Sequence, residues 1–126
     1  MNNTALQRSE LGRKGEELAR SYLQERGFVI LHGNWRYAHK EIDIIALKNN
    51  TLHIVEVKTR TSDYIQRPQD AVNKTKQRFL IAAAQAYITR YSFSGEVQFD
   101  IISILIQSHS HSIDYIPQAF YPLVGK

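Results

Sequence analysis

Apolar residues along the chain recur at helical spacing in two segments and in short, strand-like runs in five others. The first helical segment covers residues 4–26 and ends at a glycine, and an alanine-rich segment over residues 70–91 repeats the pattern. The positions that carry the first pattern are Leu11, Gly15, Leu18, Ala19 and Tyr22. The strand-like runs cover residues 28–37, 41–47, 51–59, 96–106 and 113–116. The order α-β-β-β-α-β-β predicts one mixed α/β domain over residues 1–126.

The composition excludes several classes of protein. There is no cysteine, so disulfide scaffolds, thiol nucleophiles and cysteine-ligated zinc are all ruled out. Hydrophobic residues make up 43% of the chain, which is too apolar for a disordered protein. No apolar run approaches the roughly 20 residues that a membrane span needs, and no signal peptide is visible. We therefore expect a cytoplasmic protein that does not enter a membrane.

Positive charge is concentrated in the middle of the chain. The formal net charge is +4, which permits binding to a polyanion without requiring it. Residues 58–78 carry six basic and two acidic side chains, whereas residues 96–125 contain no Lys or Arg. The pattern predicts a basic end of the molecule, although a solvated helix face would show the same pattern.

The most informative segment is an acidic hairpin, residues 41–58. Asparagine tolerates the left-handed backbone conformation, so Asn49 and Asn50 suit a two-residue turn. This register places Asp43 opposite Glu56, on one face of the sheet. The other pairs expected from it are Lys48 with Thr51, Leu47 with Leu52, Ile45 with Ile54, and Glu41 with Lys58.

Two carboxylates directly opposite each other repel, so something must offset their charge. A shared proton, a neighbouring cation such as Lys58, or a bound divalent metal would each do so. Mg²⁺ favours oxygen ligands and usually takes one or two protein carboxylates together with water and phosphate oxygens. A cross-strand salt-bridge cluster without catalytic function is the structural alternative.

The first predicted helix offers a third carboxylate. At 100° per residue, Glu16 lies at the border of the apolar face, whereas Glu17 points almost directly away from it. We therefore expect Glu16 to lean towards the sheet and Glu17 to be a solvated helix charge.

The motifs together resemble the YraN family of small bacterial proteins. They are Gly12-x-x-Gly15-Glu16-x-x-Ala19, Asn34-Trp35-Arg36, Glu41-Ile42-Asp43-Ile44-Ile45-Ala46, Val55-Glu56-Val57-Lys58-Thr59-Arg60, Pro68, Ala71-Val72, Lys76-Gln77, Phe99-Asp100 and Ala119-Phe120. That family is similar to the restriction-endonuclease-like PD-(D/E)xK superfamily, which includes archaeal Holliday-junction resolvases. The resemblance covers nearly the whole chain. It implies a mixed central sheet of about five strands flanked by helices, and a phosphodiesterase site dependent on Mg²⁺ or Mn²⁺.

The resemblance also implies roles for individual residues. Asp43 matches the first acid of the superfamily, and Glu56 with Lys58 matches its Glu-x-Lys. Glu16 matches the helix-borne glutamate of the resolvase-type members, and the backbone carbonyl of Val57 is a further metal ligand. The residues expected to contact nucleic acid are Arg60, Arg67, Lys74, Lys76, Gln77 and Arg78.

Three functions remain open at the level of sequence. The first is a metal-dependent endonuclease acting on DNA, at branched or single-stranded structures. Cutting a four-way junction would require two active sites and hence a homodimer. The second is a non-catalytic nucleic-acid-binding module on the same fold, because a fold persists when its site is lost. The third is an interaction protein in which the acidic hairpin is architecture.

Overall fold

The computed structural model describes residues 4–61 and 72–121, with side chains from residue 9 onward. Two helices and five strands follow one another in the predicted order. Their bounds are α1 Thr4–Glu25, β1 Val29–Tyr37, β2 Lys40–Lys48, β3 Thr51–Thr61, α2 Lys74–Tyr91, β4 Glu96–Ile106 and β5 His111–Phe120. The predicted fold class, a mixed five-stranded sheet with flanking helices, is confirmed.

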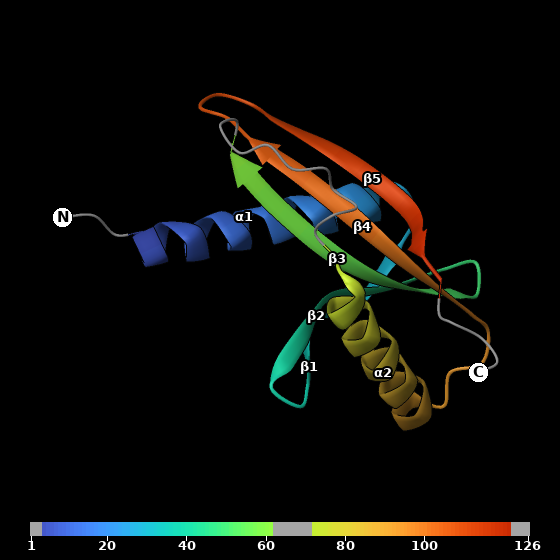
Figure 1. Cartoon of the computed structure of the whole chain (residues 1–126). Coiled ribbons are helices and arrows are strands. Elements are labelled where there is room, and N and C mark those ends of the chain that lie inside the picture. The colour runs from blue at the N-terminus through green and yellow to red at the C-terminus, as the bar shows by residue number, and fades with distance from the viewer. Residues whose placement is uncertain (1–3, 62–71, 122–126) are drawn as a thin grey trace.

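The sheet separates the two helices. Its strand order is β1-β2-β3-β4-β5, with β3 and β4 parallel and every other pair antiparallel. Helix α2 makes the crossover between the two parallel strands (Figure 1). Leu23 of α1 packs in one core together with Ile44 and Ile102, and Leu80 of α2 packs in another together with Ile54. The two helices therefore cover opposite faces of the sheet.

The predicted hairpin turn is confirmed. Asn49 and Asn50 have φ values of 51° and 64°, the left-handed conformation that a tight hairpin turn of this kind requires. The strands on either side pair in the predicted register, with Ile45 opposite Ile54. Because a slip of one residue would move every side chain to the other face, this turn decides which residues of β3 face α2.

Helix α2 begins later than its alanine-rich pattern suggested. The side chain of Asn73 accepts a hydrogen bond from the backbone N–H of Lys76 at 2.9 Å, and Val72 and Asn73 precede the helix. Asparagine at this position satisfies an N–H group that has no partner inside the helix. The predicted start at residue 70 lies outside the described residues.

Strand β5 is longer than the predicted residues 113–116. It pairs with β4 from His111 to Phe120 and passes through Pro117. Proline is compatible with an edge strand, because the missing N–H can face away from the neighbouring strand.

A buried carboxylate joins the central strands on the other side of the sheet from α2. Asp100 of β4 lies 2.7 Å from Nδ1 of His53, and it accepts hydrogen bonds from the hydroxyl of Tyr115 and the backbone N–H of Gln118. Burial alone would raise the pKa of Asp100, but these hydrogen bonds lower it overall. Asp100 is therefore a structural residue that links β3, β4 and β5.

In the part of the chain that the structure describes, neither helix is both long and apolar enough to cross a membrane.

Candidate active site

The acidic residues of the hairpin lie where two strands separate. Pairing between β2 and β3 runs from Lys48 and Thr51 to Ile44 and Val55 and ends there. Ile42 packs in the core under α2 and Ile44 in the core under α1, although strict alternation would put both on one face. Strand β2 therefore rotates away from β3 at Asp43, and β3 continues without it. We call this place the fork.

Asp43 bridges the fork. Its Oδ2 accepts a hydrogen bond of 2.8 Å from the backbone N–H of Val57. This side-chain hydrogen bond replaces the next backbone hydrogen bond between the strands and holds the first residues of β2 beside β3. In an extended strand the N–H and C=O of one residue point to the same side, so the carbonyl of Val57 opens towards Asp43.

Glu56 lies beside Asp43, and both residues are half-buried. The side chain of Glu56 is 13% exposed, and its Oε1 is buried with no hydrogen-bond partner among the described residues. Burial raises the pKa of Asp43 well above its ordinary value, and the charge of Glu56 raises it further. Burial also raises the pKa of Glu56, against the lowering effect of Lys76. The predicted encounter of two carboxylates is present in the structure.

A cation from α2 contacts this pair. Nζ of Lys76 lies 3.2 Å from Oε2 of Glu56. Sequence reasoning assigned Lys76 to phosphate binding and named Lys58 as the neighbouring cation. Lys58 also lowers the pKa of Glu56, but less than Lys76 does. An asparagine cap at residue 73 would indicate that Lys76 occupies the first turn of α2, but the carboxylate it meets depends on how α2 packs on the sheet.

Close packing of α1 on β3 brings Glu16 to the site. A Cβ atom at Gly15 would collide with the side chain of Thr59, so the helix approaches the strand at a distance that only glycine allows. The next residue, Glu16, is near enough for its charge to raise the pKa of Asp43. As predicted, Glu17 is exposed on the outer side of the helix.

An open pocket of about 340 Å³ lies between α1 and the fork. It is lined by Leu11, Gly12, Glu16, Asp43, Glu56, Val57, Lys58 and Thr59. All five residues predicted to act in catalysis or metal binding are among them, contributed by α1, β2 and β3.

Two expected ladder pairs do not form. Asp43 and Glu56 lie close together but are not paired across the ladder, because it ends at Ile44 and Val55. Glu41 was predicted to face Lys58 but pairs with Arg36 of β1, and its carboxylate lies 3.6 Å from the guanidinium of Arg36. The prediction was wrong because it extended the hairpin register past the fork, where β2 keeps β1 as its partner.

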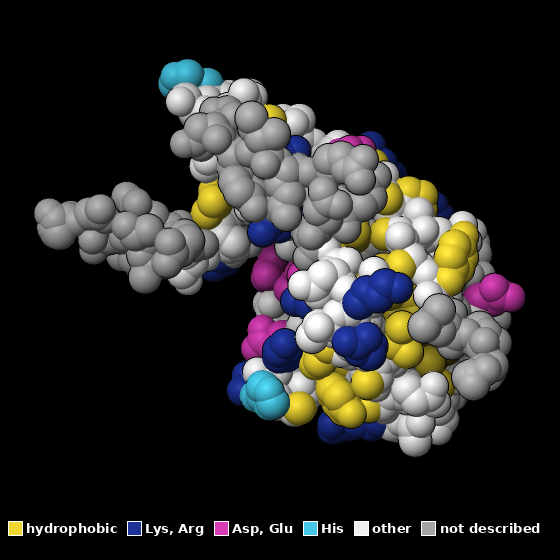
Figure 2. Space-filling model, viewed as in Figure 1, with side chains coloured by type: hydrophobic (Ala, Val, Ile, Leu, Met, Phe, Trp, Pro, Cys, Tyr) yellow, Lys and Arg dark blue, Asp and Glu magenta, His cyan; other side chains and the backbone are white. Residues whose placement is uncertain are grey.

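The predicted phosphate-binding residues are distributed along β3 and α2. Lys74 and Arg78 are exposed on α2, and Arg60 is half-buried two residues beyond Lys58. The side-chain amide of Gln77 donates to the carbonyl of Val72, so Gln77 stabilises the start of α2. Arg67 lies outside the described residues. Figure 2 shows Lys and Arg side chains gathered over α2, with acidic side chains beside them towards α1.

The donor set at the fork fits a hard divalent cation. Within residues 4–61 and 72–121, no three His, Asp or Glu side chains form a ready metal cage. Mg²⁺ needs only one or two carboxylates, because water and phosphate oxygens complete its shell. The unpartnered Oε1 of Glu56 and the carboxylate of Asp43 are oxygen donors of the required kind.

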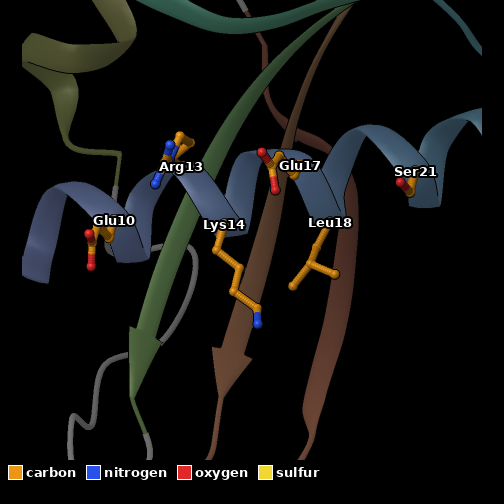
Figure 3. Close-up of a pocket in the computed structure, with 6 residues that line it drawn as sticks. All are labelled: Glu10, Arg13, Lys14, Glu17, Leu18 and Ser21. Carbon is orange, nitrogen blue, oxygen red and sulfur yellow. The ribbon is translucent and has the colours of Figure 1, made fainter.

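A larger hollow of about 570 Å³ lies along the outer side of α1. It is lined by Glu10, Arg13, Lys14, Glu17, Leu18 and Ser21, which all belong to this one helix. In Figure 3, Lys14 and Leu18 extend from the helix on the side opposite Arg13. Because these described side chains come from one helix and do not converge, the fork remains the candidate site.

The fold and the fork define the class of this protein. It is a mixed α/β protein with a five-stranded sheet between two helices, and two neighbouring carboxylates lie where β2 leaves β3.

Comparison with known sequences assigns the family. The profile of the "Uncharacterised protein family UPF0102" matches residues 15–104, so the chain belongs to that family, and the YraN resemblance is confirmed. A UPF0102 protein of Parabacteroides distasonis is 43% identical over 90% of this chain and 93% of its own length. One of Bacteroides thetaiotaomicron is 44% identical over 90% of this chain and 94% of its own length. One of Chlorobium chlorochromatii is 45% identical over 89% of this chain and 92% of its own length.

Proposed function

We propose that this protein is a metal-dependent endonuclease that hydrolyses phosphodiester bonds in DNA. The observation that carries the proposal is the fork, where Asp43 and Glu56 lie half-buried side by side in a pocket that is also lined by Lys58 and Glu16. Placing two adjacent carboxylates away from bulk water lowers the stability of the folded protein. A functional role therefore explains the arrangement better than a structural one. Strongly perturbed carboxyl groups in a cleft are typical of functional sites.

Each residue of the pocket has a chemical task in this proposal. Asp43, Glu56 and the carbonyl of Val57 would hold Mg²⁺ or Mn²⁺. When bound, such an ion polarises the phosphate and lowers the pKa of an attacking water. The ammonium group of Lys58 would stabilise negative charge that develops on the phosphate oxygens. Glu16, on the α1 side of the pocket, would accept a hydrogen bond from the attacking water and orient it.

Positive residues outside the pocket would position the nucleic acid. Lys74 and Arg78 are exposed on α2 next to Lys76, and Arg60 extends the basic side chains along β3. Arginine and lysine contacts to phosphates fix the position of a nucleic acid without reading its sequence. We expect the protein to act in the cytoplasm, and to act as a homodimer if a four-way junction is its substrate.

A cleavage assay tests the proposal. Labelled single-stranded, duplex, flap and four-way-junction DNA are incubated with the protein and Mg²⁺, Mn²⁺ or EDTA. We expect cleavage that requires metal and that falls by at least about 100-fold in Asp43→Asn and Glu56→Gln, because both remove a charged ligand. Glu16→Gln should lower the rate as well, whereas its matched control Glu17→Gln, which changes an exposed neighbour of the same type, should not.

The alternatives predict different outcomes. DNA binding that weakens with salt, without cleavage on any substrate, would overturn the nuclease proposal in favour of a non-catalytic binding module. Absence of both binding and cleavage would indicate that the fork has only a structural role. Cleavage that persists in Asp43→Asn would place the chemistry elsewhere.

A further inference from the structure

The ion pair between Lys76 and Glu56 joins α2, which we assign to DNA binding, to the fork, which we assign to metal binding. Nζ of Lys76 lies 3.2 Å from Oε2 of Glu56, and the two side chains are 31% and 13% exposed, respectively. The carboxylate is therefore fixed in the protein interior, and the lysine reaches it from the surface. The flanking basic residues of α2, Lys74 and Arg78, are exposed.

Lys76 and a divalent cation compete for the same carboxylate. Mg²⁺ binds oxygen ligands at about 2.0–2.1 Å, so an ion held by Glu56 would lie within a few ångströms of an ammonium group paired with it. Repulsion between these positive charges is strong at such short range in a partly buried site. The lysine stem has four flexible carbons, whereas Glu56 is held in the middle of a paired strand. When a cation enters, the lysine is therefore the group that moves.

We propose that Lys76 is a tethered counter-ion of the fork, which neutralises Glu56 while no divalent cation is bound and moves to the exposed basic face of α2 when one binds. The inference rests on the proposed function, because it takes the fork to be a metal site. On the surface of α2, beside Lys74 and Arg78, the released ammonium group is available to a DNA phosphate. Metal binding and DNA binding are then coupled, and each strengthens the other by the same factor.

The first test measures the position of Lys76 without any catalytic readout. The intact protein is treated briefly with an acetylating reagent, with and without saturating Mg²⁺, and modification is measured by mass spectrometry. We expect Mg²⁺ to raise the acetylation of Lys76 severalfold and to leave Lys74, two residues away on the same helix, unchanged. Calorimetry on the same samples reports whether Mg²⁺ binds.

The outcomes of this test distinguish the inference from the proposed function. Mg²⁺ binding with unchanged reactivity of Lys76 overturns the inference and leaves the metal site standing. Absence of Mg²⁺ binding overturns both.

The second test removes the tethered charge. Calorimetry should show that Lys76→Met binds Mg²⁺ about fivefold more tightly than the unaltered protein, because no cation has to be displaced. The matched variant Lys74→Met should keep the original Mg²⁺ affinity. Equal or weaker Mg²⁺ binding by Lys76→Met would contradict the inference.

The same two variants test the coupling. Mg²⁺ should increase the DNA affinity of the unaltered protein, and Lys76→Met should show a smaller increase, because only the direct attraction between the ion and phosphate is left. Lys74→Met should bind DNA more weakly both with and without Mg²⁺ and keep the ratio between the two. An undiminished Mg²⁺ effect in Lys76→Met would show that the coupling does not pass through this residue.

Discussion

Individual residues at the fork are placed at a cost to stability. Asp43 accepts a hydrogen bond from Val57, and Glu56 forms an ion pair with Lys76, while its Oε1 has no hydrogen-bond partner in the described residues. Asp100 shows the contrast within the same sheet, because four hydrogen-bond partners surround its carboxylate and lower its pKa. The hydrogen bonds of Asp100 thus lower its pKa, whereas the pKa values of both carboxyl groups at the fork are raised.

We predict that Asp43→Asn stabilises the protein in EDTA, and increasingly so as the pH rises. The pKa of Asp43 is raised in the folded state, so its protonated form favours folding below the ordinary value of 3.8, and this stability is lost as the pH rises through the raised pKa. Asparagine keeps a hydrogen-bond acceptor for Val57 and carries no charge. Urea unfolding should show little difference near pH 4 and a gain of about 1 kcal/mol in the variant near neutral pH.

The control for this prediction is Mg²⁺ itself. A cation that binds only the folded protein should stabilise the unaltered chain, by about 1–3 kcal/mol well above its dissociation constant, and leave Asp43→Asn unchanged. A variant less stable than the unaltered protein at every pH would show that Asp43 is a structural residue after all.

At the scale of elements, the approach of α1 to β3 decides where Glu16 lies. Gly12 and Gly15 are both in α1 and both face the sheet side, but they differ in their surroundings. A Cβ atom at Gly15 would collide with Thr59, whereas at Gly12 nothing lies within 4 Å. The two glycines therefore form a matched pair for testing the packing.

We predict opposite effects of alanine at these two positions. Gly12→Ala should stabilise the protein by up to about 1 kcal/mol, because alanine favours the helix and meets no neighbour. Gly15→Ala should destabilise it by about 1–2 kcal/mol, since overpacking against β3 outweighs the gain in helix propensity. Thermal and urea unfolding measure both changes. Similar stabilisation by both substitutions would contradict the close contact between α1 and β3.

At the scale of the whole molecule, basic side chains are arranged unevenly around the sheet. Lys74 and Arg78 lie at the beginning of α2, close to the fork, while Arg90 lies in its last turn. At 1.5 Å per residue, the two ends of this helix are roughly 24 Å apart. A nucleic acid seated on the fork would therefore contact one end of α2 and not the other.

The salt dependence of DNA binding should reveal this polarity. Lys74→Met and Arg78→Met should each weaken binding and reduce the slope of log affinity against log salt concentration by about 1, the value for one lost phosphate contact. Arg90→Met is the control, because it removes an arginine at the other end of the same helix. It should leave the slope unchanged. Fluorescence anisotropy over a range of salt concentrations measures all three. An equal effect of Arg90→Met would place the nucleic acid elsewhere.

The sequence by itself determined the elements, the hairpin register and the family. Local rules suffice for these, because the asparagine turn at residues 49 and 50 sets which side chains share a face, and apolar spacing sets the helices. The outward direction of Glu17 also followed from local geometry, and the hairpin indicated that Asp43 and Glu56 lie near each other, although the ladder ends before they pair.

Only the tertiary structure decided the rest. The fork, the pairing of Glu41 with Arg36 and the ion pair of Lys76 with Glu56 depend on how strands rotate and helices pack between segments far apart in the chain. Strand periodicity carries no information about where a ladder ends, and a helical pattern does not say which carboxylate a lysine will meet. These contacts depend on how the helices and strands pack against one another, which is determined only in the complete fold.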